Sequence, residues 1–306
     1  MSIWDNPQLA RFNTIPSIRL SLNEGNTPFY RAMYDNTKVV IKNEMVNPNN
    51  SFKDRSLCYQ LSHYLAKGIV KFVISSSGNA AISAASYIAS HGESEIDIFI
   101  GNQITDGKKE KLTALASDKI RIHQGQKPKS DAIKFSKETI ALNLRGSIDD
   151  VALTGFKTIA YEIAEETPDI DCLFLPTSSG TSALGLHYGF EEMGLKVAIF
   201  ICQSQKVHPI AEEFDKDFES QKDSIADAIV DKVALRKSKL VQVLKQNKGG
   251  GLVLSDFNIF HAQAKTGLAN IFMPSYNSAL AFAGLSKALK LPDFNYKMPL
   301  ILVSGI

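Results

Sequence analysis

The chain has 306 residues, of which 44% are hydrophobic and 22% charged, a composition typical of a globular protein with a sizeable core. Its 34 lysines and arginines are nearly balanced by 32 acidic residues, and a net charge of +2 predicts no general attraction to nucleic acid. No segment has the apolar length of a membrane span, and residues 1–12 lack the apolar stretch of a signal peptide. We therefore expect a cytoplasmic protein with neither a nucleic-acid nor a membrane partner.

Cysteine and histidine usage predicts no metal site and no disulfide framework. The three cysteines, Cys58, Cys172 and Cys202, lie far apart in apolar runs, which is typical of buried reduced thiols. The six histidines are dispersed without the spacing of metal ligands.

From about residue 71 onward, short β-branched or aromatic runs alternate with amphipathic segments of helix length, which indicates an α/β fold with a parallel sheet. Strands are predicted at residues 72–75, 96–100, 120–123, 172–175, 197–202, 252–254 and 300–303. Helices are predicted at residues 57–65, 80–90, 108–116, 130–143, 156–166, 181–193, 232–246 and 277–290. The charge run at residues 212–222 predicts an exposed helix face, and residues 249–251 predict a flexible turn.

Lys53, in the segment formed by residues 47–55, is the first candidate catalytic residue along the chain. Pro48 and the asparagines around it disfavour helix, and Ser51 can cap the helix that follows, so Lys53 falls in its first turn. The positive end of a helix dipole favours a neutral amine, which can attack an aldehyde or accept a proton. A lysine in a first turn is more often only solvated, and the local pattern leaves both interpretations open.

Two further polar segments join a predicted strand to a predicted helix, the place where open α/β sheets bind ligands. Residues 75–80 combine three hydroxyls with a helix start, which suits a carboxylate or phosphate, or only a polar helix cap. Residues 176–185 place five hydroxyls and two glycines around a helix start and predict a stronger anion site. This segment lacks the lysine of a nucleoside-triphosphate loop, which favours the phosphate group of another cofactor.

Together and in this order, the three segments resemble the fold-type II pyridoxal-phosphate enzymes, most closely the threonine synthases. Lys42-Asn43-Glu44, Asn47-Pro48 and residues 51–55 (Ser-Phe-Lys-Asp-Arg) are similar to the family's lysine signature, and residues 24–28 (Glu-Gly-Asn-Thr-Pro) to its opening motif. Residues 155–162, 274–279 and 303–305 resemble later landmarks, so the resemblance runs from about residue 24 to the last residue.

The resemblance implies a two-lobed fold like that of tryptophan synthase β, with mostly parallel sheets flanked by helices. Residues 1–54 and 152–306 would form a large cofactor-binding lobe, and residues 55–151 a small lobe that binds the substrate carboxylate. Pyridoxal 5′-phosphate would lie between the lobes, and a homodimer is expected from the family.

The resemblance also implies site residues. Lys53 would hold the cofactor as a Schiff base and take the Cα proton, Asn79 would bind the phenolic oxygen, and Ser304 would face the pyridine nitrogen. The phosphate would be bound by Ser178, Ser179, Gly180, Thr181 and Ser182, where Ser178 and Thr181 replace the usual glycines. The substrate would contact Ser76, Ser77, Gly78, Asn79, Ala80 and Lys157.

The implied function is that of a carbon–oxygen lyase that converts O-phosphohomoserine and water to threonine and phosphate. Ala152 stands where an arginine is expected to hold the substrate phosphate, and a methyl group cannot replace a guanidinium. Arg145, Lys157 or Lys108 are alternative sources of positive charge. A serine or threonine ammonia-lyase, or a β-replacing synthase, is the first alternative function, and a catalytically silent binding homologue is the second.

Overall fold

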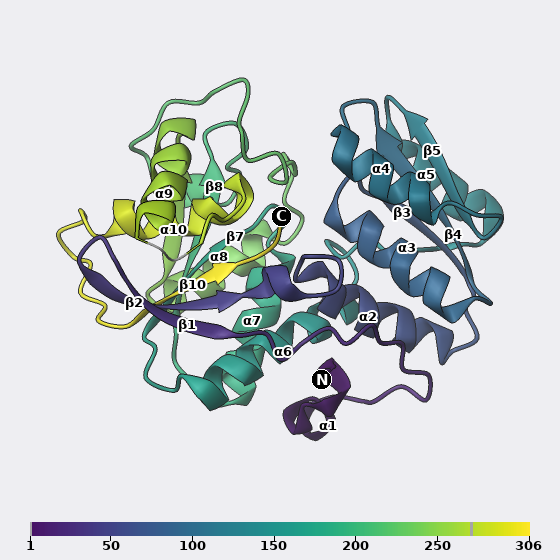
Figure 1. Cartoon of the computed structure of the whole chain (residues 1–306), viewed down its shortest axis with the longest axis horizontal. Helices are drawn as coiled ribbons and strands as arrows, with labels where there is room; N and C mark the ends of the chain where they lie inside the picture. Colours follow the sequence, from purple (N-terminus) through teal and green to yellow (C-terminus); the bar gives the residue numbers. More distant parts are fainter. Residues whose placement is uncertain (1, 270–271) are drawn as a thin grey trace. The chain divides into compact units, whose positions relative to one another are not determined.

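The computed structural model describes residues 2–269 and 272–306, and the chain forms two compact units (Figure 1). Unit 1 comprises the residues up to Asn26 together with Asn47–Thr158, and unit 2 comprises Thr27–Val46 and Ile159–Ile306. The last boundary falls within helix α6 (Val151–Glu166), which therefore contributes to both units. The lobe boundaries implied by the resemblance stay a prediction.

Unit 2 is built on a six-stranded sheet. Its strands are β1 (Phe29–Tyr34), β2 (Thr37–Asn43), β7 (Cys172–Pro176), β8 (Ala198–Ser204), β9 (Gly250–Leu254) and β10 (Pro299–Val303). Their order is β1-β2-β10-β7-β8-β9, and only the β1–β2 pair is antiparallel among these described strands. Strands β7 to β10 are buried along their whole length, which explains their continuous apolar sequences.

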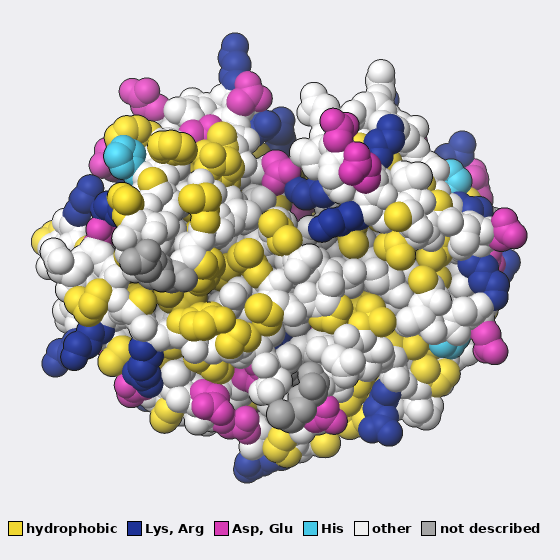
Figure 2. Space-filling model, viewed as in Figure 1, with side chains coloured by type: hydrophobic (Ala, Val, Ile, Leu, Met, Phe, Trp, Pro, Cys, Tyr) yellow, Lys and Arg dark blue, Asp and Glu magenta, His cyan; other side chains and the backbone are white. Residues whose placement is uncertain are grey.

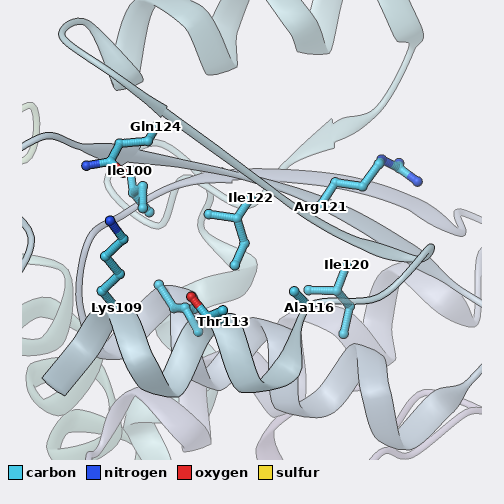
Figure 3. Close-up of a pocket in the computed structure, with 9 residues that line it drawn as sticks. Ile100, Lys109, Thr113, Ala116, Ile120, Arg121, Ile122 and Gln124 are labelled. Atoms are coloured by element: carbon cyan, nitrogen blue, oxygen red, sulfur yellow. The ribbon is translucent and has the colours of Figure 1, made fainter. Parts of the chain in front are cut away.

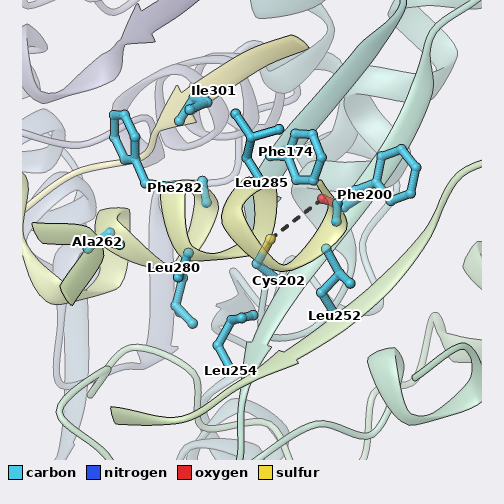
Figure 4. Packing of buried hydrophobic residues seen from close by; sticks show 14 of the residues in the cluster. Phe174, Phe200, Cys202, Leu252, Leu254, Ala262, Leu280, Phe282, Leu285 and Ile301 are labelled. Atoms are coloured by element: carbon cyan, nitrogen blue, oxygen red, sulfur yellow. Dashed lines mark hydrogen bonds between the residues drawn. The ribbon is translucent and has the colours of Figure 1, made fainter. Parts of the chain in front are cut away.

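Helix α10 (Tyr276–Ala288) packs across this sheet, and α9 (Asp256–Leu268) packs on α10. Figure 4 shows Phe282 and Leu285 of α10 among the sheet residues Phe174 and Phe200, all in one buried cluster. The backbone of α10 approaches the sheet closely, because a Cβ on Gly284 would lie 2.3 Å from the Cys202 Sγ. Helices α7 (Thr181–Glu192) and α8 (Lys237–Gln246) contact each other and β8.

Unit 1 contains a four-stranded parallel sheet made of β3 (Lys71–Ser75), β4 (Glu95–Gly101), β5 (Ile120–Gly125) and β6 (Leu142–Asn143). The strand order is β5-β4-β3-β6. Helix α5 (Pro128–Thr139) packs on β3 and β4, and α3 (Asn79–His91) packs on β4 and β5. Helices α2 (Lys53–Leu65) and α4 (Asp106–Leu115) pack against α3, and α1 (Pro7–Phe12) precedes them in the chain.

The structure confirms the α/β class and every predicted strand, with shifts of a few residues at their ends. The predicted helix at residues 232–246 is confirmed as α8, which begins at Lys237. The predicted helix at residues 130–143 ends at Thr139, and residues 142–143 belong to strand β6 instead. The charge run at residues 212–222 holds only the end of a short 3-10 helix, Ala211–Glu213, so the helix predicted there is wrong. Residues 249–251 are not a flexible turn, because a Cβ on Gly249 would lie 2.2 Å from the Ile199 carbonyl oxygen and the next two glycines belong to β9.

The three cysteines are free and buried as predicted, and burial raises the pKa of each thiol above its usual value. Among the described residues, no helix has both the length and the apolar character that a bilayer crossing requires.

Replacing Gly284 with alanine would force a methyl group into the contact between α10 and β8. We expect Gly284→Ala to lower the free energy of unfolding by about 1–3 kcal/mol, the usual cost of overpacking a core. Urea denaturation followed by circular dichroism measures this. The control is Gly107→Ala in α4, where an added Cβ meets no atom within 4 Å. A Gly284→Ala protein as stable as the control would contradict the packing.

Candidate functional site

Lys53 begins helix α2 and is the one residue in the range 51–62, described throughout, that is not buried. Its Nζ lies 4.9 Å from the ring centroid of Phe52 and 5.5 Å from that of Phe156. The predicted serine cap is displaced by one position: Phe52 is the N-cap residue, and the Ser51 hydroxyl oxygen accepts from the Lys53 backbone N–H at 3.3 Å. Lys53 is therefore partly accessible at an otherwise buried helix start.

The adjacent Asp54 fixes the turn that carries this lysine. Its carboxylate is fully buried and accepts from the Asn49 backbone N–H at 2.7 Å, the Asn49 side-chain amide at 2.8 Å and the Ser83 hydroxyl at 2.5 Å. Burial raises the pKa of Asp54 above its usual value, against the opposing effect of these donors. Because Ser83 lies in α3, Asp54 joins the lysine segment to the helix that begins at Asn79.

The predicted carboxylate loop, residues 75–80, is half-buried throughout. The Ser77 Oγ accepts from the Gly101 backbone N–H at 2.8 Å, which fixes the loop to the end of β4, and the Ser76 Oγ accepts from the Gly78 N–H at 3.3 Å. Gly78 occupies the N-cap position of α3. Each serine hydroxyl still has its own proton to donate, so the loop suits an anion at this helix start.

In unit 2, the hydroxyls of the predicted phosphate loop are arranged in pairs around the start of α7. The Ser179 and Thr181 oxygens lie 2.9 Å apart, and those of Thr177 and Ser182 lie 3.3 Å apart. Gly180 has φ of +85°, the left-handed conformation that favours glycine. The loop therefore turns sharply and directs several hydroxyls to one end of the helix.

The first turn of α7 also offers backbone donors. The N–H of Leu184 donates to the Gly180 carbonyl at 3.0 Å. No carbonyl among the described residues accepts from the N–H groups of Ser182 and Ala183, although both residues are buried. Buried N–H groups rarely lack an acceptor, and donors at the positive end of a helix fit a phosphate group.

Ser304 follows β10, which pairs in parallel with β7, so Ser304 and the phosphate loop lie at the same edge of one sheet. The next residue, Gly305, is held by α10: its carbonyl accepts from the Ser275 hydroxyl at 2.6 Å and from the Ser278 hydroxyl at 2.7 Å. The Ser278 hydroxyl oxygen in turn accepts from the Gly305 N–H at 3.2 Å. In the sequence, Ser275 and Ser278 were recognised only as part of a segment that resembles the family, and their hydrogen bonds to Gly305 were not predicted.

The predicted substrate residue Lys157 and the departure at Ala152 both lie on α6. The Lys157 Nζ donates to the Asn13 Oδ1 at 3.0 Å. Ala152 is 1% exposed, and its carbonyl accepts from the Ser56 hydroxyl of α2 at 2.8 Å. Here α6 lies directly on α2, because a Cβ on Gly155 would be 2.1 Å from a carbonyl oxygen of that helix. The Ala152 methyl group therefore belongs to the packed interior of unit 1.

A cavity of about 480 Å³ lies between α4 and the edge of the unit 1 sheet (Figure 3). Its wall is largely apolar, with Ile100, Ile120 and Ile122 on the strands and Lys109 on the helix. None of the predicted site residues lines this cavity, so it is separate from the candidate site. Within residues 2–269 and 272–306, no group of three histidine, cysteine or acidic side chains is placed to hold a metal ion.

Comparison with known proteins finds relatives similar in sequence to this chain. The chain is similar to the threonine synthase of Methanocaldococcus jannaschii, with 25% identity over 291 residues that cover 89% of this chain and 71% of that protein. It is 26% identical to the threonine synthase of Mycobacterium tuberculosis over 282 residues, covering 88% of this chain and 78% of that protein.

Solved structures with the same fold include maize serine racemase, with a TM-score of 0.76 and 18% identity over 92% of this chain and 88% of that chain. The processed form of threonine deaminase isoform 2 from Solanum lycopersicum has a TM-score of 0.76 and 19% identity, covering 99% of this chain and 82% of that one. The family model described as pyridoxal-phosphate dependent enzyme matches residues 20–305. The chain thus belongs to the fold-type II pyridoxal-phosphate-dependent enzymes, and pyridoxal 5′-phosphate is its cofactor.

Proposed function

We propose that this enzyme is a carbon–oxygen lyase that converts O-phosphohomoserine and water to threonine and phosphate. The observation that carries the proposal is Lys53, a partly exposed residue at the start of α2 among buried neighbours, in a segment similar to the lysine signature of threonine synthases. Similarity to threonine synthases over almost nine-tenths of the chain supports it. The proposal includes a cytoplasmic homodimer, with residues 1–54 and 152–306 as the large lobe and residues 55–151 as the small lobe.

In this proposal, the cofactor is held by Lys53, Asn79 and the hydroxyl-rich start of α7. Lys53 would bind the cofactor through its amine, and Asn79 would bind the phenolic oxygen. The hydroxyls of Ser179, Thr181 and Ser182, with the N–H donors of the first turn of α7, bind the phosphate. When bound, pyridoxal 5′-phosphate supplies an electron sink that stabilises negative charge at the substrate Cα.

In this proposal, Ser304 controls the strength of that electron sink through the protonation of the pyridine nitrogen. A serine hydroxyl is a weak acid that leaves the pyridine nitrogen unprotonated, whereas a carboxylate at this place would favour the protonated ring. The hydrogen bonds from the Ser275 and Ser278 hydroxyls to the Gly305 carbonyl hold the backbone next to Ser304 in place. This tuning suits elimination and replacement better than transamination.

Lys53 then acts as the general base. In this proposal, its amine would accept the substrate Cα proton. The hydrogen bonds of Asp54 fix the turn, and the rings of Phe52 and Phe156 shield part of the side chain from water. The substrate carboxylate binds at the start of α3, among Ser76, Ser77 and the N–H groups of that turn.

A serine or threonine ammonia-lyase is the second candidate, and the buried Ala152 is the observation that favours it. An enzyme of this kind needs no cation for a substrate phosphate, so the absent arginine is no obstacle to it. Threonine deaminase from Solanum lycopersicum is among the proteins of similar structure. A catalytically silent homologue is disfavoured because Lys53 is present. It is also disfavoured because no carbonyl among the described residues accepts from the N–H groups of Ser182 and Ala183 in α7.

Borohydride reduction of the holoenzyme is expected to fix the cofactor on Lys53. Proteolysis and mass spectrometry should then find the modification on the peptide that contains this residue, because its amine is the one that carries the aldehyde. Lys157→Ala should be modified to the same extent and serves as the control. Modification of another lysine would contradict the proposed attachment.

A substrate panel separates the two candidate reactions. We expect phosphate release from O-phosphohomoserine with kcat/KM at least about tenfold above that of ammonia release from serine or threonine, a difference of about 1.4 kcal/mol in transition-state binding. Ammonia release without phosphate release would overturn the threonine synthase assignment and favour the ammonia-lyase.

A further inference from the structure

A long irregular segment of unit 2 connects two parts of the candidate site. Residues 214–236, all of which the structure describes, contain no helix or strand. Loops of this length inside a compact unit are uncommon and often functional. Residues 224–231, which we call the strap, are held by polar side chains at three places.

The first two anchors attach the strap to the starts of α9 and α10. The Asp256 carboxylate, in the first turn of α9, accepts from the Ser224 hydroxyl at 2.7 Å and from the Ile225 N–H at 3.2 Å. The Asn277 side chain, in the first turn of α10, accepts from the Ala228 N–H at 2.9 Å and donates to the Asp227 carboxylate at 2.7 Å. This same turn of α10 holds the backbone beyond Ser304, as described above.

The third anchor is Ser178, at the beginning of the phosphate loop. Its hydroxyl oxygen accepts from the Val230 N–H at 3.0 Å and from the Asp231 N–H at 2.9 Å. Its proton points to the Asp231 carboxylate, with the two oxygens 3.4 Å apart. A hydroxyl has one proton and two lone pairs, so these contacts use its whole hydrogen-bonding capacity.

We propose that Ser178 is a positioning residue that fastens the strap to the phosphate loop, and that its hydroxyl is not a ligand of the phosphate. This inference rests on the phosphate site proposed above. Glycine at this position, the residue usual in the family, lacks a hydroxyl and provides no such anchor.

Hydrogen exchange at the Val230 and Asp231 amides measures the anchor directly. In the holoenzyme, we expect Ser178→Ala to accelerate exchange at both amides by at least about tenfold, because their acceptor is removed. Ser178→Thr keeps a hydroxyl and should restore slow exchange. Titration with pyridoxal 5′-phosphate should show an affinity within about threefold of wild type for Ser178→Ala and reduced by more than about tenfold for Ser182→Ala.

Equal exchange at both amides in wild type and Ser178→Ala would overturn the anchor. A loss of cofactor affinity in Ser178→Ala as large as that in Ser182→Ala would also overturn it, since the hydroxyl would then act as a phosphate ligand. The proposed phosphate site fails in a different way: Ser182→Ala would bind the cofactor as wild type does, while Ser178→Ala would still accelerate exchange at the strap.

Discussion

The hydrogen bonds of the buried Asp54 carboxylate determine where the lysine of this enzyme can point. Removing one partner from a buried polar group costs about 1–3 kcal/mol, so the three bonds from Asn49 and Ser83 strongly favour one conformation of the turn. Lys53 is the residue of this turn that stays accessible while its neighbours are buried. A single carboxylate thus joins the lysine segment to α3 and its candidate carboxylate-binding loop.

Unit 2 depends on a different constraint, the parallel direction of its strands. Since β7 and β10 run side by side in the same direction, the loops that follow them meet at one edge of the sheet. Hydroxyls dominate this edge: those of the phosphate loop surround the start of α7, and Ser275 and Ser278 fix the backbone beyond Ser304. The strap contacts residues at both places, Ser178 and Asn277.

The sequence predicts those parts of the fold whose pattern is local. Strands β7, β8 and β10 are buried on both faces, and their continuous apolar runs were recognisable for that reason. Helix α9 was missed because Phe257, Phe260 and Leu268 are exposed, which removes the amphipathic period. Figure 2 shows hydrophobic side chains at the surface over the region of this helix. The β1–β2 hairpin was missed because β1 is an edge strand of mixed burial.

The site shows the same division between local and distant contacts. The lysine segment and the hydroxyl-rich helix starts are contiguous in sequence, so their motifs identified them. The bonds of Asp54 to Ser83, Ser178 to Asp231 and Ser278 to Gly305 each join residues far apart in the chain, and no spacing rule predicts such pairs. Likewise, the position of Ser178 in its loop predicts a phosphate ligand but does not reveal the contact of its hydroxyl with Asp231.

Replacing Lys53 with alanine tests the central claim most directly. Visible absorption of added pyridoxal 5′-phosphate and turnover of the preferred substrate would be measured for the variant beside wild type. The account predicts that Lys53→Ala shows no lysine-linked absorption band and no measurable turnover, while circular dichroism shows a folded protein. A folded Lys53→Ala protein that stays yellow and active would contradict it.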